Sequence, residues 1–150
     1  MPQSLSQVVV HFVFSTKNRE PCLNDTIRPS LHAYLATLSR DIDCPCHRVG
    51  GVRDHVHFAV SLGRQISQSK WVEHVKTRSS KWLKTQDASL SAFAWQRGYG
   101  AFSVSPGHLE QLVCYIDNQE KHHERVTFQD EYRKLLARYG INYDENYVWD

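Results

Sequence analysis

The chain has 150 residues, of which 41% are hydrophobic and 23% are charged, with a formal net charge of +2. This composition excludes an intrinsically disordered chain and fits a single globular domain over residues 1–150. The longest apolar runs, Val8–Val10 and Phe12–Phe14, are far shorter than the ~20 residues of a membrane-spanning helix. No basic segment followed by an apolar one begins the chain, so we expect no secretory signal and a cytoplasmic location.

The first half of the chain predicts one helix among three extended segments. Val8, Val10, Phe12 and Phe14 alternate along the first segment, which is typical of a buried strand. The expected elements are a strand over 5–14, a helix from about 27 to 42 with Pro29 in its first turn, an extended segment over 44–51, and a strand over 52–62.

The second half predicts three helices and a short stretch of sheet. Ser67 begins a long amphipathic helix to about residue 85, and one or two short strands lie within 93–105. Ser105-Pro106 opens a helix to about residue 123, and a last helix over 128–139 stops at Gly140. The first six elements have the order of a ferredoxin-like split βαβ fold. We therefore expect an α+β fold whose antiparallel sheet carries helices on one face, followed by two C-terminal helices.

Charge is unevenly distributed along the chain. Residues 64–84 carry six basic residues and one acid, whereas residues 117–150 carry eight acids and five basic residues. A basic stripe on one helix is the pattern expected of a surface that binds a phosphate backbone. A solvated helix face explains the same stripe equally well.

His55 and His57 form the sharpest chemical motif in the sequence. Alternate residues of a strand point the same way and lie about 7 Å apart, so both imidazoles project from one face. Two imidazoles placed in this way can bind one divalent ion. The alternative is a pair of unrelated surface histidines on a half-exposed strand.

A second motif lies on the predicted helix over 106–123. At about 100° per residue, Tyr115, Gln119 and His122 share one side of the helix, apart from its apolar stripe. This arrangement suits the edge of an active site. A tyrosine at the boundary of the core, with its hydroxyl in water, is the simpler alternative.

These motifs together resemble the single-tyrosine HUH transposases of the IS200/IS605 type. HVH on a strand is followed some 58 residues later by a helix that carries YIDNQ. The stretches VVVHFVFSTKNR, GGVRDHVHFAV and WQRGYGAFSVS extend the resemblance over essentially the whole chain.

The resemblance implies a metal site and a nucleophile. His55 and His57 match the metal-binding histidines, Tyr115 matches the nucleophile, and Gln119 matches the residue that completes the metal site. His122 is a candidate for a supporting role beside them. The family implies cleavage and rejoining of hairpin-bearing single-stranded DNA through a 5′-phosphotyrosine, with Mg²⁺ or Mn²⁺. It also implies a homodimer, in which the tyrosine of one subunit can serve the histidines of the other.

The basic residues supply candidates for DNA binding, and two other functions stay open. The candidates are Lys17, Arg19, Arg53, Arg64, Lys70, Lys76, Arg78 and Lys81. One alternative is a domesticated relative that binds single-stranded nucleic acid without cleaving it. The other is an HUH nickase of the replication type, which the small size of the chain disfavours.

Overall fold

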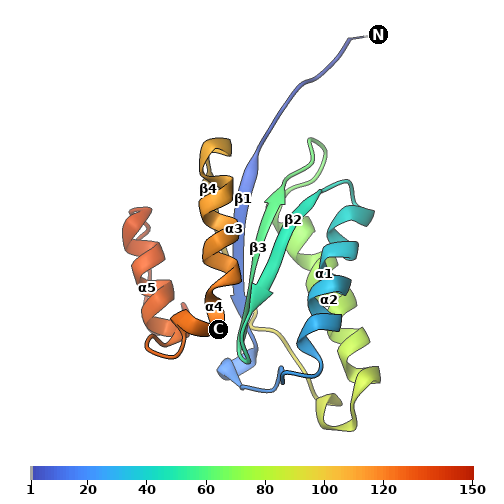
Figure 1. The fold of residues 1–150 in the computed structure, drawn as a ribbon, viewed down its shortest axis with the longest axis vertical. Coiled ribbons are helices and arrows are strands. Elements are labelled where there is room, and N and C mark those ends of the chain that lie inside the picture. Colours follow the sequence, from blue (N-terminus) through green and yellow to red (C-terminus); the bar gives the residue numbers. More distant parts are fainter. Residues whose placement is uncertain (1) are drawn as a thin grey trace.

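A four-stranded antiparallel sheet in the order β2-β3-β1-β4 is the framework of the computed structural model, which describes residues 2–150 (Figure 1). This order and the alternation of strands and helices confirm the predicted ferredoxin-like fold class. The elements are β1 (Val9–Ser15), α1 (Arg28–Asp41), β2 (Cys46–Gly51), β3 (His55–Ser61), α2 (Gln68–Gln86), β4 (Gly100–Val104), α3 (Leu109–Asp117), α4 (Gln119–His122) and α5 (Phe128–Arg138). None of the helices over residues 2–150 combines the length and apolar character needed to cross a membrane.

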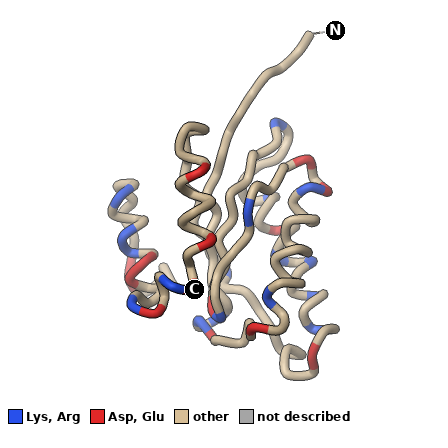
Figure 2. Tube along the Cα trace, viewed as in Figure 1, with Lys and Arg blue, Asp and Glu red and all other residues tan. Residues whose placement is uncertain are grey.

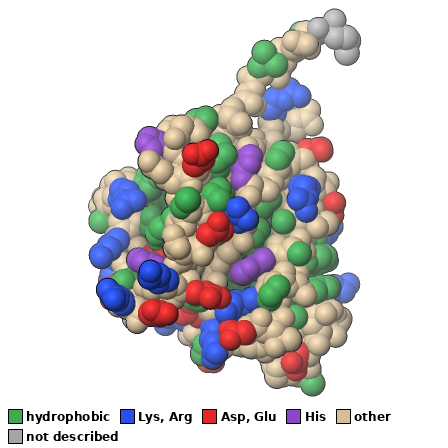
Figure 3. Space-filling view, viewed as in Figure 1, with side chains coloured by type: hydrophobic (Ala, Val, Ile, Leu, Met, Phe, Trp, Pro, Cys, Tyr) green, Lys and Arg blue, Asp and Glu red, His purple; other side chains and the backbone are tan. Residues whose placement is uncertain are grey.

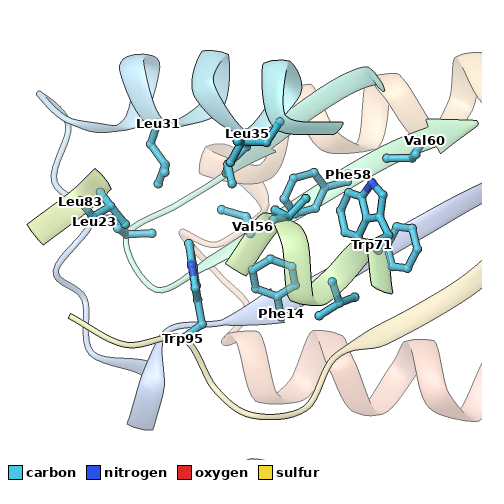
Figure 4. Close-up of a cluster of buried hydrophobic side chains, with 14 of the residues drawn as sticks. Phe14, Leu23, Leu31, Leu35, Val56, Phe58, Val60, Trp71, Leu83 and Trp95 are labelled. Carbon is cyan, nitrogen blue, oxygen red and sulfur yellow. The ribbon is translucent and has the colours of Figure 1, made fainter. Parts of the chain in front are cut away.

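One face of the sheet carries the main hydrophobic core, beneath α1 and α2 (Figure 4). Phe12 and Phe14 of β1 and Phe58 of β3 point to this face because side chains alternate along a strand. Trp71 of α2 stacks on Phe12 with ring centroids 4.0 Å apart, and it is fully buried. Leu31 and Leu35 bring α1 onto the same core.

The opposite face carries α3, α4 and α5, so helices cover both faces of the sheet. Leu112 and Ile116 of α3 pack on Ala59 of β3. A separate cluster joins α5 to β1 and β4, and its buried members are Val13, Phe102, Phe128, Tyr132, Leu135 and Leu136. In Figure 1, α3 lies in front of the sheet and α5 stands beside α3, toward one edge of the sheet.

The predicted strands are longer than the observed ones. The first begins at Val9, and Val8, which we expected on the buried side, is 49% exposed. The third begins at His55, because the preceding residues form a tight turn in which the Val52 N–H donates to the His55 carbonyl at 3.2 Å. Within 93–105 only β4 forms a strand, and the rest contributes one isolated bridge between Thr16 and Trp95.

The helix predicted over 106–123 is interrupted. Pro106–His108 form a single 3₁₀ turn, α3 ends at Asp117, and α4 begins at Gln119. Asn118 between them has φ −95° and ψ 11°, outside the helical region. Asparagine side chains compete with the helical hydrogen bonds of the backbone, which favours a break at this residue.

Gly50 of β2 allows α3 to approach the sheet closely. A Cβ atom at this position would lie 2.5 Å from Ile116 Cγ2 and 3.0 Å from the Ile116 carbonyl oxygen. We expect Gly50→Ala to push α3 outward and to lower the free energy of unfolding by about 1–3 kcal/mol in urea denaturation. Gly107→Ala is the control, since nothing lies within 4 Å of its Cβ position. Equal stability of the two variants would contradict this packing.

Candidate active site

Three histidines from the two central strands point to the face that α3 and α5 cover. His55 and His57 lie on β3, and His11 lies on β1, whose Val13 pairs with His57. All three are buried, His55 and His57 completely. The ring centroids of His55 and His57 are 5.0 Å apart, so the strand pattern brings two imidazoles to one point, away from solvent.

The Nδ1 atom of each central imidazole is held by a neighbour, and so is that of His123, which directly follows α4. The contacts are His55 Nδ1 to Asp54 Oδ1 at 2.7 Å, His57 Nδ1 to His11 Nε2 at 2.7 Å, and His123 Nδ1 to the Val126 carbonyl oxygen at 2.6 Å. Such contacts fix the ring orientation of metal-binding histidines. They leave three Nε2 atoms facing a common centre.

The carboxylate of Glu131, on α5, occupies that centre. Its Oε1 atom lies 3.0 Å from His57 Nε2, 3.1 Å from His123 Nε2 and 3.3 Å from His55 Nε2. Gln119, at the start of α4, places its Oε1 atom 3.0 Å from His55 Nε2 and donates from Nε2 to Glu131 Oε2 at 2.9 Å. Both Gln119 and Glu131 are buried.

This cluster has an excess of hydrogen-bond acceptors, which favours a cation. His55 and His123 must carry hydrogen on Nδ1 to donate to Asp54 and to the Val126 carbonyl, so in the neutral rings Nε2 is an acceptor. These acceptors face the carboxylate of Glu131. The potential ligand atoms of His55, His57, His123 and Glu131 all lie within 4.8 Å of one another. The residues present therefore fit a divalent metal ion held by nitrogen and oxygen ligands.

Without a metal, a proton balances this cluster. Burial lowers the pKa of His55, but hydrogen bonds to Asp54 and Glu131 outweigh burial and raise that pKa to about 9. Burial lowers the pKa of His57 to about 4 despite its bond to Glu131. Burial raises the pKa of Glu131, but bonds from His123, His55 and His57 hold it well below its usual range. His55 is thus the group whose proton a metal ion would replace.

Tyr115 of α3 brings a hydroxyl group to the same cluster. The hydroxyl donates to Glu131 Oε2, and its ring centroid is 5.6 Å from that of His57. Burial and the charge of Glu131 both raise the pKa of Tyr115 above its usual range. The phenol therefore keeps its proton at neutral pH unless a cation joins the cluster. Tyr115 and the two strand histidines meet within one chain.

The structure brings together all four residues on which the sequence interpretation depends. His55, His57, Tyr115 and Gln119 all contact Glu131 or a neighbour of it. His122 stands at the edge, with Nε2 3.4 Å from Glu131 Oε2 and its side chain 35% exposed.

Sequence reasoning missed Glu131 and did not separate His123 from His122. The break at Asn118 turns α4, so that His123, not His122, points to the centre of the cluster. A signal for Glu131 was present, because it lies three residues after Phe128 and four before Leu135, on the buried stripe of α5. An acid on the apolar stripe of a helix indicates a buried partner.

Most of the candidate DNA-binding residues lie away from this cluster. The helix α2, which carries Lys70, Lys76, Arg78 and Lys81, packs on the other face of the sheet (Figure 2). The ammonium group of Lys76 donates to the carbonyl oxygens of residues 96–98 at 2.6–3.3 Å, and its role in binding DNA stays a prediction.

The remaining candidates lie in loops. Lys17, Arg19 and Arg53 flank the end of the sheet where β1 ends and β3 begins, which is also the end that carries His55. Arg64 lies in the exposed loop between β3 and α2.

Comparison with known proteins identifies one family, and nine chains of solved structures match this fold, including the two below. The family described as "Transposase IS200 like" matches residues 4–119. A candidate transposase of Deinococcus radiodurans R1 has a TM-score of 0.62 at 20% identity, over 79% of this chain and 98% of that one. A REP-associated tyrosine transposase bound to a REP hairpin has a TM-score of 0.61 at 16% identity, over 84% of this chain and 74% of that one. Among curated proteins, none matches this chain.

The raised pKa of His55 predicts how stability depends on pH when metal is removed. The protonated His55 side chain contributes its full stabilisation below the ordinary pKa of 6.5, and this contribution is lost as pH rises through its raised pKa of about 9. In EDTA, we expect the free energy of unfolding to fall by roughly 1–3 kcal/mol between pH 6.5 and 9.5. Thermal or urea unfolding at several pH values measures the fall, and an equal fall in His55→Asn would contradict this assignment.

Proposed function

We propose, since this chain belongs to the family of IS200-like transposases, that it cleaves and rejoins single-stranded DNA with Tyr115 as the nucleophile. The observation that carries the proposal is the meeting of the Tyr115 hydroxyl with an acceptor-rich cluster of histidines and one carboxylate. A hairpin next to the cleaved linkage is the proposed substrate, by analogy with the hairpin bound to the similar REP-associated transposase.

Four side chains would hold a divalent metal ion, Mg²⁺ or Mn²⁺, beside the nucleophile. They are His55, His57 and Glu131, whose potential ligand atoms and that of His123 lie within 4.8 Å of one another, and Gln119, whose Oε1 atom lies 3.0 Å from His55 Nε2. When bound, the ion supplies positive charge that polarises the phosphodiester and stabilises the departing 3′-oxygen. Asp54 and His11 orient the two imidazoles, and burial keeps competing water away from them.

Tyr115 and Glu131 carry out the covalent step. Glu131 Oε2 accepts the hydrogen bond of the phenol and so orients its oxygen, and the phenolic proton passes to solvent as that oxygen attacks phosphorus. The bond from phosphorus to the 3′-oxygen breaks, and the departing 3′-oxygen takes up a proton from solvent to become a 3′-hydroxyl. Attack by a 3′-hydroxyl on the phosphotyrosine reverses these steps and restores Tyr115. No external energy source is needed, because one phosphodiester replaces another.

A single chain can supply the whole proposed site. Tyr115 contacts the Glu131 of its own chain, and Glu131 contacts its own His55 and His57. We therefore propose cleavage by the tyrosine in cis, in place of a composite site between two subunits. Mixing a Tyr115→Phe protein with a His57→Ala protein should then recover no activity, whereas recovered activity would show that tyrosines act in trans.

Removal of the Tyr115 hydroxyl should abolish covalent capture of DNA. The substrate is a pool of hairpin oligonucleotides with randomised single-stranded flanks, incubated with Mn²⁺. We expect wild-type protein to form an adduct that survives SDS and Tyr115→Phe to form none, because the attacking oxygen is absent. Tyr147→Phe, at a tyrosine that is 71% exposed, is the matched control. Binding by the wild-type protein without any adduct would instead indicate a non-catalytic DNA-binding protein.

Neutralising Glu131 should weaken metal binding directly. Glu131→Gln keeps the shape of the side chain but removes the charge that faces three imidazoles. We expect the Kd for Mn²⁺, measured by electron paramagnetic resonance, to rise at least ~10-fold. The matched variant Glu124→Gln changes an exposed acid and should bind Mn²⁺ as the wild type does. An unchanged Kd in Glu131→Gln would remove Glu131 from the metal site.

A further inference from the structure

A cavity of about 570 Å³ lies between α3 and α5 and opens from the candidate active site. Tyr115 and Glu131 form part of its wall, so it leads directly to the reacting hydroxyl. Its α5 side continues through Lys134 and Arg138, which follow Glu131 at helical spacing on one face of the helix. The α3 side adds the uncharged amide of Gln111.

The open part of this cavity is cationic. Lys134 and Arg138 are exposed, and neither forms an ion pair within the part of the chain that the structure describes. Their neighbour Arg133 differs, because it faces away and pairs with Asp130 and Glu145. Glu131 is the acid in the cavity wall, and its charge is already shared with the histidines. Basic side chains gather over α5 on the molecular surface (Figure 3).

We propose that this cavity is the channel for single-stranded DNA next to the scissile linkage, with Lys134 and Arg138 binding consecutive phosphates. The proposal rests on the proposed cleavage function and adds to it the residues that hold the substrate. One helical turn separates the two side chains by about 5–6 Å along α5, so each can meet a different phosphate. The two charges would fix the strand against α5 and present one phosphodiester to Tyr115.

The dimensions favour a single strand over a duplex. The cavity volume of about 570 Å³ is in the range of pockets that enclose a drug-sized ligand. A cavity of this size has room for only a short stretch of a single DNA strand. The major groove of double-stranded DNA is by itself ~12 Å wide, so the whole double helix is too broad to enter a cleft between two adjacent helices. The cations also lie on one wall only, which suits one phosphate backbone.

Removal of the two α5 charges tests the channel. Lys134→Ala with Arg138→Ala should raise the Kd for a fluorescent hairpin oligonucleotide with a single-stranded flank at least ~10-fold, and should lower the slope of log Kd against log salt by about 1.4. The matched control is Arg40→Ala with Lys84→Ala, which removes one Arg and one Lys from exposed positions across the sheet. Lys134→Arg with Arg138→Lys keeps both charges and should retain most of the affinity.

The outcomes separate this proposal from the cleavage proposal. Equal loss of affinity in the α5 variant and the control variant, or unchanged affinity in the α5 variant, would overturn the channel. With DNA at saturating concentration, the α5 variant should form the Tyr115 adduct more slowly than the Arg40→Ala, Lys84→Ala control, because the strand is no longer fixed against α5. Failure of the wild-type protein to form any adduct would overturn the cleavage function, and the binding measurements would still decide whether the cavity holds DNA.

Discussion

The convergence of one buried carboxylate with three imidazoles and a phenol determines how this protein is organised around its site. Glu131 reaches from α5 to histidines on the central strand β3, to the amide of Gln119 and to the hydroxyl of Tyr115. A carboxylate is seldom buried unless it is paired, because loss of hydration is costly. Here the imidazole partners are themselves acceptors in their neutral form, so the arrangement is complete only with a proton or a metal ion at its centre. The same contacts attach α5 and α4 to the sheet, which links the stability of this half of the fold to its chemistry.

The two faces of the sheet differ in what they carry: one faces the main hydrophobic core and the other faces the candidate site. On β3, the alternation of side chains sends Val56, Phe58 and Val60 into the main core and sends His55 and His57 the other way. The core beneath α1 and α2 therefore holds the strand rigid, and a rigid strand keeps the two imidazoles in a fixed relative position, as a metal site requires. The other residues of the candidate site, Tyr115, Gln119 and Glu131, lie on the helices that follow the ferredoxin-like unit.

The part of the site that depends on local sequence pattern could be predicted, and the part that depends on long-range packing could not. Strand alternation placed His55 and His57 on one face, and their resemblance to a family motif linked them to Tyr115 and Gln119. Glu131 reaches the site through the docking of α5, which no spacing within the helix specifies. His123 reaches it through the break at Asn118, a single residue with non-helical dihedral angles. The net charge of a segment also does not show which side chains line the cavity. Residues 117–150 are acidic in sum, yet Lys134 and Arg138 line the cavity beside Tyr115.

The most direct test of the central claim is the position of Mn²⁺ in crystals of the protein, located by anomalous scattering at the manganese absorption edge. We predict one ion at the centre of the cluster, ~2.0–2.3 Å from His55 Nε2, His57 Nε2 and an oxygen of Glu131, with the Tyr115 oxygen within reach of a bound phosphate. An ion bound elsewhere, with the Glu131 carboxylate still seated among the imidazoles, would contradict the account.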